Sequence, residues 1–270
     1  MKISKFISIK LSAILIASSF TLSVNVFAAG NSFQVTPPPI PYPYFEQGRK
    51  DVKMVGNYVS MQGSGLDMTG IGFNGNTRNV SEKNSKIAFD GSFAIFTMGG
   101  DFKTGGFELD ITNVAMTPQF DIEYQLYRKD KLSLIGFAGF TVPFFFASTE
   151  GGGSGVSIES TITGFMYGIP FGVQAGYHFH EKWTFAPFFM VNWMLGGSVS
   201  TSTTTETNGF SSFDDTTDSI DGYIAPSYGG DFIYEPLNIS VGGALQIAKG
   251  GGSSGDIDTK TFHFSWHKRF

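Results

Sequence analysis

The residues from Phe262 to His267 alternate strictly between aromatic and polar side chains, and the sequence finishes on a phenylalanine. Aromatic rings occupy positions 262, 264 and 266, whereas polar groups occupy positions 263, 265 and 267. Because successive side chains of a strand point to opposite faces, this segment predicts a strand with one aromatic face and one polar face. Such a strand suits a wall that separates lipid from a polar interior.

The same period of two recurs along much of the chain. Its clearest example places eight apolar residues at the odd positions from Phe165 to Phe179, which a helix does not produce. Similar but shorter alternation predicts further strands at residues 120–126, 183–195 and 237–247. Less regular strands are expected at residues 52–61, 86–98, 132–146 and 223–233.

The connections between these runs fall into two kinds that alternate through the C-terminal half. Short connections are expected at Arg128–Lys131, His180–Lys182 and Tyr234–Pro236. Longer ones, rich in Gly, Ser, Thr and Asp, are expected at Phe146–Ile162, Leu195–Gly222 and Lys249–Asp258. This asymmetry is typical of membrane barrels with short periplasmic turns and long outer loops.

The N-terminal residues predict a segment that is removed and a segment that is not part of the wall. Three lysines precede an apolar stretch from Leu11 to Val24, and Val26-Phe27-Ala28 follows it, so residues 1–28 are expected to form a secretory signal. Residues 29–50 contain five prolines between Thr36 and Tyr44, which favours a stiff, extended periplasmic spacer. The barrel is expected to occupy residues 51–270.

The number of strands is less sharply defined by the pattern. Seven strands lie between Phe120 and Phe270, and a strand at 86–98 makes eight. The apolar phase changes from odd at Phe107, Leu109 and Ile111 to even at Val114 and Met116, which indicates two strands that meet near Asn113. With a strand at 52–61 the count becomes ten. We therefore expect eight to ten strands and favour ten.

The terminal phenylalanine, the alternating aromatics and the loop asymmetry resemble those of small Gram-negative outer-membrane β-barrels of the OmpA-transmembrane and OmpW-like class. The resemblance implies an all-β, antiparallel, up-and-down transmembrane barrel in the outer membrane, with both termini in the periplasm. It also implies contact with outer-membrane lipid and lipopolysaccharide. The barrel-assembly machinery would bind the C-terminal strand through Phe262, Phe264, Trp266 and Phe270.

The alternation also predicts which polar side chains face the interior. A barrel of about eight strands is just wide enough for side chains to fill it or to hold one small ligand. The interior therefore either is filled by hydrogen-bonded groups or forms a narrow passive channel for small solutes; an alternative is a structural or surface-interaction role of the long outer loops. The lumen-facing candidates are Asp121, Glu123, Gln125, Gln174, Asn192, Gln246, His263, Ser265, His267 and Arg269.

Other chemistries find little support in the sequence. The chain has no cysteine, which excludes thiolate chemistry, and its net charge of −5 argues against a nucleic-acid surface. His263-Phe264-Ser265 resembles the His-x-Ser motif of outer-membrane lipid A deacylases, but Trp266 follows the serine where that family has Asn. A lipid-modifying enzyme is thus a distant alternative. We expect no metal, cofactor or catalytic site.

These expectations make a first test straightforward. The purified protein should require detergent to remain in solution, because its apolar side chains face outward, and its far-ultraviolet circular dichroism should show a strand-rich spectrum. A protein that is soluble without detergent, or mostly helical, would contradict the barrel.

Overall fold

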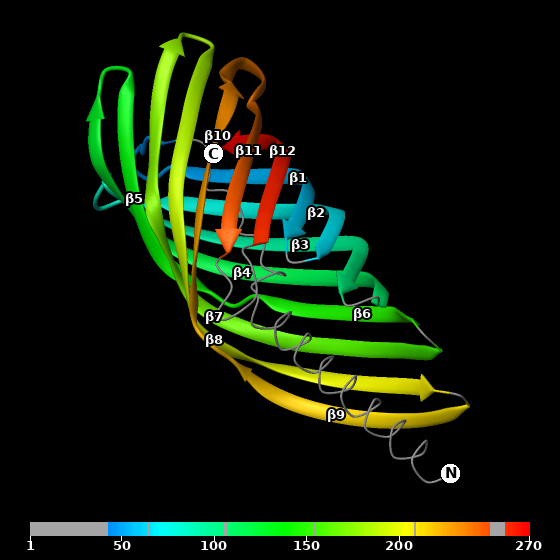
Figure 1. The fold of residues 1–270 in the computed structure, drawn as a ribbon. Coiled ribbons are helices and arrows are strands. Elements are labelled where there is room, and N and C mark those ends of the chain that lie inside the picture. Colours follow the sequence, from blue (N-terminus) through cyan, green and yellow to red (C-terminus); the bar gives the residue numbers. More distant parts are fainter. Residues whose placement is uncertain (1–42, 64, 105–106, 154, 208, 249–256) are drawn as a thin grey trace, which may run out of the picture.

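The computed structural model describes residues 43–63, 65–104, 107–153, 155–207, 209–248 and 257–270. The predicted signal at residues 1–28, and residues 29–42 of the predicted spacer, lie outside the described residues. The described residues form one antiparallel sheet that closes on itself (Figure 1). No helix among them is long and apolar enough to cross a membrane.

Twelve strand segments occupy ten positions around the ring. β5 and β6 share one position, since both pair with β4 on one side and β7 on the other, and β9 and β10 share another beside β8. Pairing of β1 with β12 closes the ring. The segments are β1 (Lys50–Gly63), β2 (Leu66–Val80), β3 (Ile87–Thr104), β4 (Phe107–Lys129), β5 (Leu132–Thr141), β6 (Phe144–Gly153), β7 (Val156–His180), β8 (Trp183–Thr207), β9 (Phe210–Ile220), β10 (Tyr223–Tyr234), β11 (Ile239–Ala248) and β12 (Ile257–Arg269).

The predicted all-β barrel is confirmed. The favoured number of ten strands equals the number of strand positions in the ring, but only because two errors in the prediction cancel. β2, which contains Gly70, Gly72 and Gly75, is a strand that the alternation does not predict. β4, in contrast, runs unbroken for 23 residues although two strands are expected to meet near Asn113.

The change of apolar phase in β4 records a change of environment along one strand. Its odd-numbered side chains face inward throughout: Leu109 and Ile111 are buried near one end, and Asp121 and Glu123 are buried near the other. The outward side chains change in the opposite sense, from polar at exposed Asp110 to apolar at exposed Phe120. The inner face is thus apolar where the outer face is polar, and polar where the outer face is apolar.

Two of the predicted long loops are instead extensions of the strands. Most of residues 146–162 belong to β6 and β7, and most of residues 195–222 belong to β8 and β9. The Ser- and Thr-rich segment for which a long loop is expected therefore forms paired strands. The third predicted loop, Lys249–Asp258, lies almost wholly outside the described residues.

The two ends of the barrel differ. At the end that we call the terminal end lie Phe270, Pro43 and the connections that precede β3, β5, β8 and β11 (Figure 1). At the opposite end, the hairpin end, the wall is uneven, because β7 and β8 are 25 residues long whereas β11 has only 10. The tall part of the wall therefore extends well beyond the ring.

An apolar belt surrounds the terminal half of the barrel. Large apolar side chains point outward on strand after strand, and Phe262 and Phe264 are 62% and 57% exposed. An exposed apolar surface of this extent is typical of a face that contacts lipid or another protein. Members of the belt from across the ring include Met54, Phe73, Phe93, Phe120, Ile122, Phe140, Phe171, Val173, Phe189, Tyr228, Phe232, Val241, Phe262, Phe264 and Trp266.

We expect a charge in the middle of this belt to destabilise the protein only when lipid is present. Phe264→Lys should lower the free energy of unfolding in lipid vesicles by about 2–4 kcal/mol, the cost of a lysine at the centre of a bilayer. Phe213→Lys in β9, outside the belt, is the matched control and should have little effect. Equal effects of the two substitutions, measured by denaturant unfolding, would show that the belt does not lie in the membrane.

Candidate functional site

The inner face of the barrel has two zones of opposite chemistry. Charged and amide side chains fill the terminal half, and aliphatic, methionine and aromatic side chains fill the hairpin half. The boundary follows the inversion seen along β4. Any solute that passed through the bore would meet both zones in turn, so each is described separately.

An ion-pair cluster centred on Arg78 occupies the terminal half. The Nε atom of Arg78 lies 2.7 Å from Oε2 of Glu123, and its Nη1 atom lies 3.6 Å from Oδ2 of Asp51. Asp51 in turn accepts a 2.6 Å hydrogen bond from Nε of Arg49. Arg78 is completely buried, so the neighbouring carboxylates compensate a charge that water does not reach.

The strand register explains why these groups meet. Asp51, Arg78, Asp90 and Asp121 lie directly opposite one another on β1, β2, β3 and β4, and therefore form a transverse row of buried charges. Carboxylates outnumber arginines in this row. Lys53, which is also fully buried, faces the same interior from β1.

A second network links β10, β11 and β12, which follow β1 on the other side of the ring closure. Oδ1 of Asp231 lies 2.8 Å from Nε2 of His263 and accepts a 3.0 Å hydrogen bond from Ser240. Ser265 contacts the hydroxyl of Ser240 and lies 3.2 Å from Nε2 of His267. All five side chains are buried.

This arrangement corrects the pairing that the motif suggested. Ser265 contacts His267 rather than His263, because His263 is held by Asp231. A serine nucleophile needs a base that is oriented by a third group. Here the carboxylate of Asp231 contacts the other histidine. The network cross-links three strands in a buried position.

The structure places nine of the ten lumen-facing candidates in these buried surroundings. Eight of them belong to β4, β7, β8 and β12, and the ninth, Gln246, belongs to β11. Each of the nine is at most 7% exposed. Arg269 differs, since about a third of its side chain remains exposed at the terminal end. The buried nine are Asp121, Glu123, Gln125, Gln174, Asn192, Gln246, His263, Ser265 and His267.

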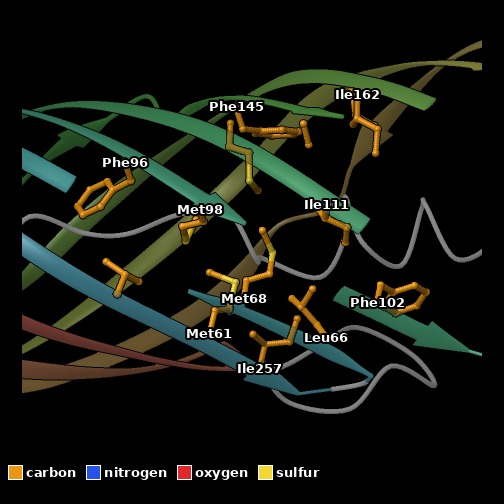
Figure 2. Close-up of a cluster of buried hydrophobic side chains, with 14 of the residues drawn as sticks. Met61, Leu66, Met68, Phe96, Met98, Phe102, Ile111, Phe145, Ile162 and Ile257 are labelled. Atoms are coloured by element: carbon orange, nitrogen blue, oxygen red, sulfur yellow. The ribbon is translucent and has the colours of Figure 1, made fainter. Parts of the chain in front are cut away.

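An apolar cluster fills the inner face of the hairpin half. Figure 2 shows Met61, Met68 and Ile257 on one part of the wall and Phe145 and Ile162 on another. The water-filled channel of a porin is lined by polar groups, and this zone does not fit that description. The other labelled members are Leu66, Phe96, Met98, Phe102 and Ile111.

Two aromatic side chains lie at the terminal end of the bore. Phe45 is 1% exposed and packs with Val80, Ala88 and Ile135. Tyr44 packs against the buried pair Ala186 and Ile233. The end of the predicted spacer is therefore docked on the barrel, and we call Pro43, Tyr44 and Phe45 the terminal seal.

Arginines hold the terminal seal in place. Arg128 donates a 2.6 Å hydrogen bond to the carbonyl oxygen of Phe45, and Arg269 donates a 3.2 Å hydrogen bond to the hydroxyl of Tyr44. The guanidinium groups of Arg49, Arg128 and Arg269 lie 5.5–5.7 Å from the centre of the Tyr44 ring. Such cation–π contacts stabilise most when they are shielded from water. Burial accordingly raises the pKa of Tyr44.

The approach of the terminal seal to the wall requires a glycine. A Cβ atom at position 176 of β7 would collide with the ring of Pro43. Arg78, Lys53, Tyr44 and Phe45 are not among the lumen-facing candidates that the alternation predicts. The cross-strand register that brings them together is a long-range property that local alternation does not reveal.

A row of carboxylates runs along the outside of the hairpin end from β2 to β7. Cross-strand neighbours on β2, β3, β4, β6 and β7 are all acidic, which places like charges directly opposite one another. Beside the row, a hydrogen bond from Lys103 to Glu108 raises the pKa of the lysine. The acidic row consists of Asp67, Asp101, Asp110, Glu150 and Glu159.

The four histidines do not gather at one site. His178 lies near Tyr44 and Glu235 at the terminal end, whereas His263 and His267 belong to the network of β12. Within the described ranges, no group of three or more His, Cys, Asp or Glu side chains has the geometry to hold a metal ion.

Comparison with solved structures shows the fold. The outer membrane protease OmpT from Escherichia coli matches with a TM-score of 0.50 at 11% identity, over 87% of this chain and 98% of that chain. The outer membrane protein OprG from Pseudomonas aeruginosa matches with a TM-score of 0.42 at 10% identity, over 84% and 98% of the two chains. Ail, the attachment invasion locus protein of Yersinia pestis, matches with a TM-score of 0.34 at 14% identity, over 83% and 100%.

The chain thus has the fold of bacterial outer-membrane β-barrels, which confirms the class that the sequence resembles. At these identities the likeness shows the fold and no particular activity. No protein-family model and no curated protein matches the sequence.

The buried position of Arg78 leads to a prediction about stability. Arg78→Leu should lower the free energy of unfolding by about 3–5 kcal/mol, because it leaves Glu123 and Asp51 without their partner in the interior. Denaturant unfolding of the refolded barrel in micelles measures this change. Lys103→Leu, which breaks the exposed ion pair with Glu108, is the control and should unfold near the wild-type midpoint. A midpoint for Arg78→Leu that matches the control would show that the cluster does not stabilise the fold.

Proposed function

We propose that this protein is a narrow, gated passage for small solutes in the outer membrane, with the terminal end in the periplasm and the gate closed in the present conformation. The terminal seal carries this proposal. It belongs to the chain before the wall and is held by side-chain contacts, whereas the wall is held by backbone pairing. The seal can therefore be displaced without opening the ring.

The two inner zones suggest what kind of solute passes. Hydrophobic constrictions exclude hydrated ions by dewetting, and the apolar cluster would act in this way. The ion-pair cluster would offer polar contacts in the terminal half. Small solutes with both polar and apolar parts fit a bore with one polar and one apolar zone better than ions or large polar molecules do. In this proposal the Ser265 network is structural, and the protein has no catalytic role.

The proposed location also assigns partners to the outer surfaces. The apolar belt would contact outer-membrane lipid, and the acidic row would lie near the lipopolysaccharide headgroups. The C-terminal strand would bind the barrel-assembly machinery during insertion, through Phe262, Phe264, Trp266 and Phe270, of which the first three belong to the belt.

A second candidate function is interaction with a partner at the cell surface. The tall part of the wall favours it, because residues 183–248 contain no Lys, Arg or His and the acidic row runs beside them. OmpT, OprG and Ail share the fold, and the name of Ail refers to attachment, so the fold does not decide between the two roles.

Planar-bilayer recordings test the gated passage. The wild-type protein should give rare, small openings, whereas Tyr44→Ala combined with Phe45→Ala should open several times more often, since the seal loses both rings. Phe210→Ala combined with Phe213→Ala, at the hairpin end, is the matched control and should behave as the wild type. A double seal variant that remains silent while keeping its strand-rich spectrum would rule out a passage gated by these residues.

A further inference from the structure

β9 is an unpaired edge in a sheet that is otherwise closed. Within the described residues it pairs with β8 alone, whereas each of the other strand segments has neighbours on both sides. β9 and β10 occupy the same position in the ring. The second neighbour of that position, β11, begins only at Ser227 of β10, which pairs with Gln246. β9 therefore presents an edge of eleven residues at the hairpin end.

This edge is held firmly by the rest of the wall. β9 pairs with β8 along its whole length, from Thr207 opposite Phe210 to Gly197 opposite Ile220, and Gly209 lies in the left-handed region at a φ of 79°. The hydroxyls of Ser200 and Thr217 lie 3.0 Å apart across the pair. β8 in turn pairs along its full length with β7. An edge of this kind is a template on which a further strand can form hydrogen bonds.

The edge is also strongly acidic. Asp214, Asp215 and Asp218 all lie in β9 and are exposed. No ion pair joins them to a cation in the part of the chain that the structure describes, and the sequence from 183 to 248 has no cationic side chain. Their charges are therefore available to a partner. Phe213, which is 67% exposed, adds an apolar contact beside them.

We propose that β9 binds an extended, cationic peptide segment of a partner protein as an added strand. The free edge supplies backbone hydrogen bonds, and the three carboxylates select for lysine or arginine. This inference rests on the surface-interaction role and is independent of any conductance through the bore.

The positions of the carboxylates define the segment further. Asp214 and Asp218 project from one face of β9 and Asp215 projects from the other, because side chains alternate along a strand. An added strand would therefore carry two cationic residues four positions apart on one face. A third, adjacent to one of them, would lie on the opposite face. Opposite charges placed across neighbouring strands in this way stabilise the pairing.

A second copy of this chain is a poorer occupant of the edge. Pairing β9 with β9 of another molecule would bring six carboxylates together along a short interface, and like charges opposite one another destabilise a sheet. A cationic segment removes this repulsion instead of doubling it.

The test uses the full-length mature barrel refolded in detergent and a capped nine-residue peptide that carries two lysines four positions apart, a third lysine next to one of them, and threonine and valine elsewhere. Titration calorimetry should show binding, and hydrogen exchange should show protection of β9 amides. Asp214→Asn, Asp215→Asn and Asp218→Asn together should weaken binding by about tenfold or more, from the loss of three charge pairs. Asp67→Asn, Asp101→Asn and Asp110→Asn, an equal charge change in the acidic row, should leave binding nearly unchanged.

Two further peptides of the same sequence separate the possible results. The backbone amides are methylated at every odd position in one peptide and at every even position in the other. Loss of binding by the methylated peptides supports an added strand. Equal binding would overturn strand addition while the surface-interaction role stands, because charge alone would then account for the affinity. If no peptide binds, both this inference and the cationic partner are wrong. Dimers of the barrel without peptide, detected by light scattering, would show a second copy on the edge and would also overturn the proposal.

Discussion

The closure of the ring by β1 and β12 is the contact on which the rest of the structure depends. Backbone amides and carbonyls have no water to bond with in hydrocarbon, so a sheet can cross a membrane only when it has no open edge there. The register between β1 and β12 runs from Asp51 opposite Arg269 to Gln62 opposite Asp258. Closure then fixes one face of every strand toward the bore and the other toward the surroundings, which creates the apolar belt and the filled interior together.

A closed ring of this size leaves little choice for its interior. The bore is narrow, and polar side chains that face it are removed from bulk water, so they must be paired with one another. Arg78 with Glu123 and Asp51, and Asp231 with His263, meet this requirement. The terminal seal lies at one end of the ion-pair cluster, and the apolar cluster lies at its other end. In the proposed gated passage, the same contacts that stabilise the bore would also keep it closed.

The sequence predicts the terminal half well because alternation there reports a constant environment on each face. β7, β8 and β12 were recognised for this reason. β2 was missed because glycines replace three of its side chains and weaken the pattern. β4 was divided because its apolar residues change faces where the outer surroundings change, and β9 was taken for a loop because both its faces are polar. The ion-pair cluster and the acidic row depend on strand register, which no local pattern contains.

The hairpin half resembles a water-soluble sheet that has been joined to a membrane protein. Its inner face is apolar and its outer face polar, so it buries its own core and needs no lipid. The acidic row opposes this stability, because neighbouring carboxylates across a strand pair lie about 5 Å apart, within the Debye length at physiological salt. The proposed binding of cationic groups would account for a surface that retains five such charges in register near an acidic strand with an exposed edge. In that proposal the wall of the hairpin half supports the surface, and the apolar inner core stabilises the part of the wall that lies beyond the apolar belt.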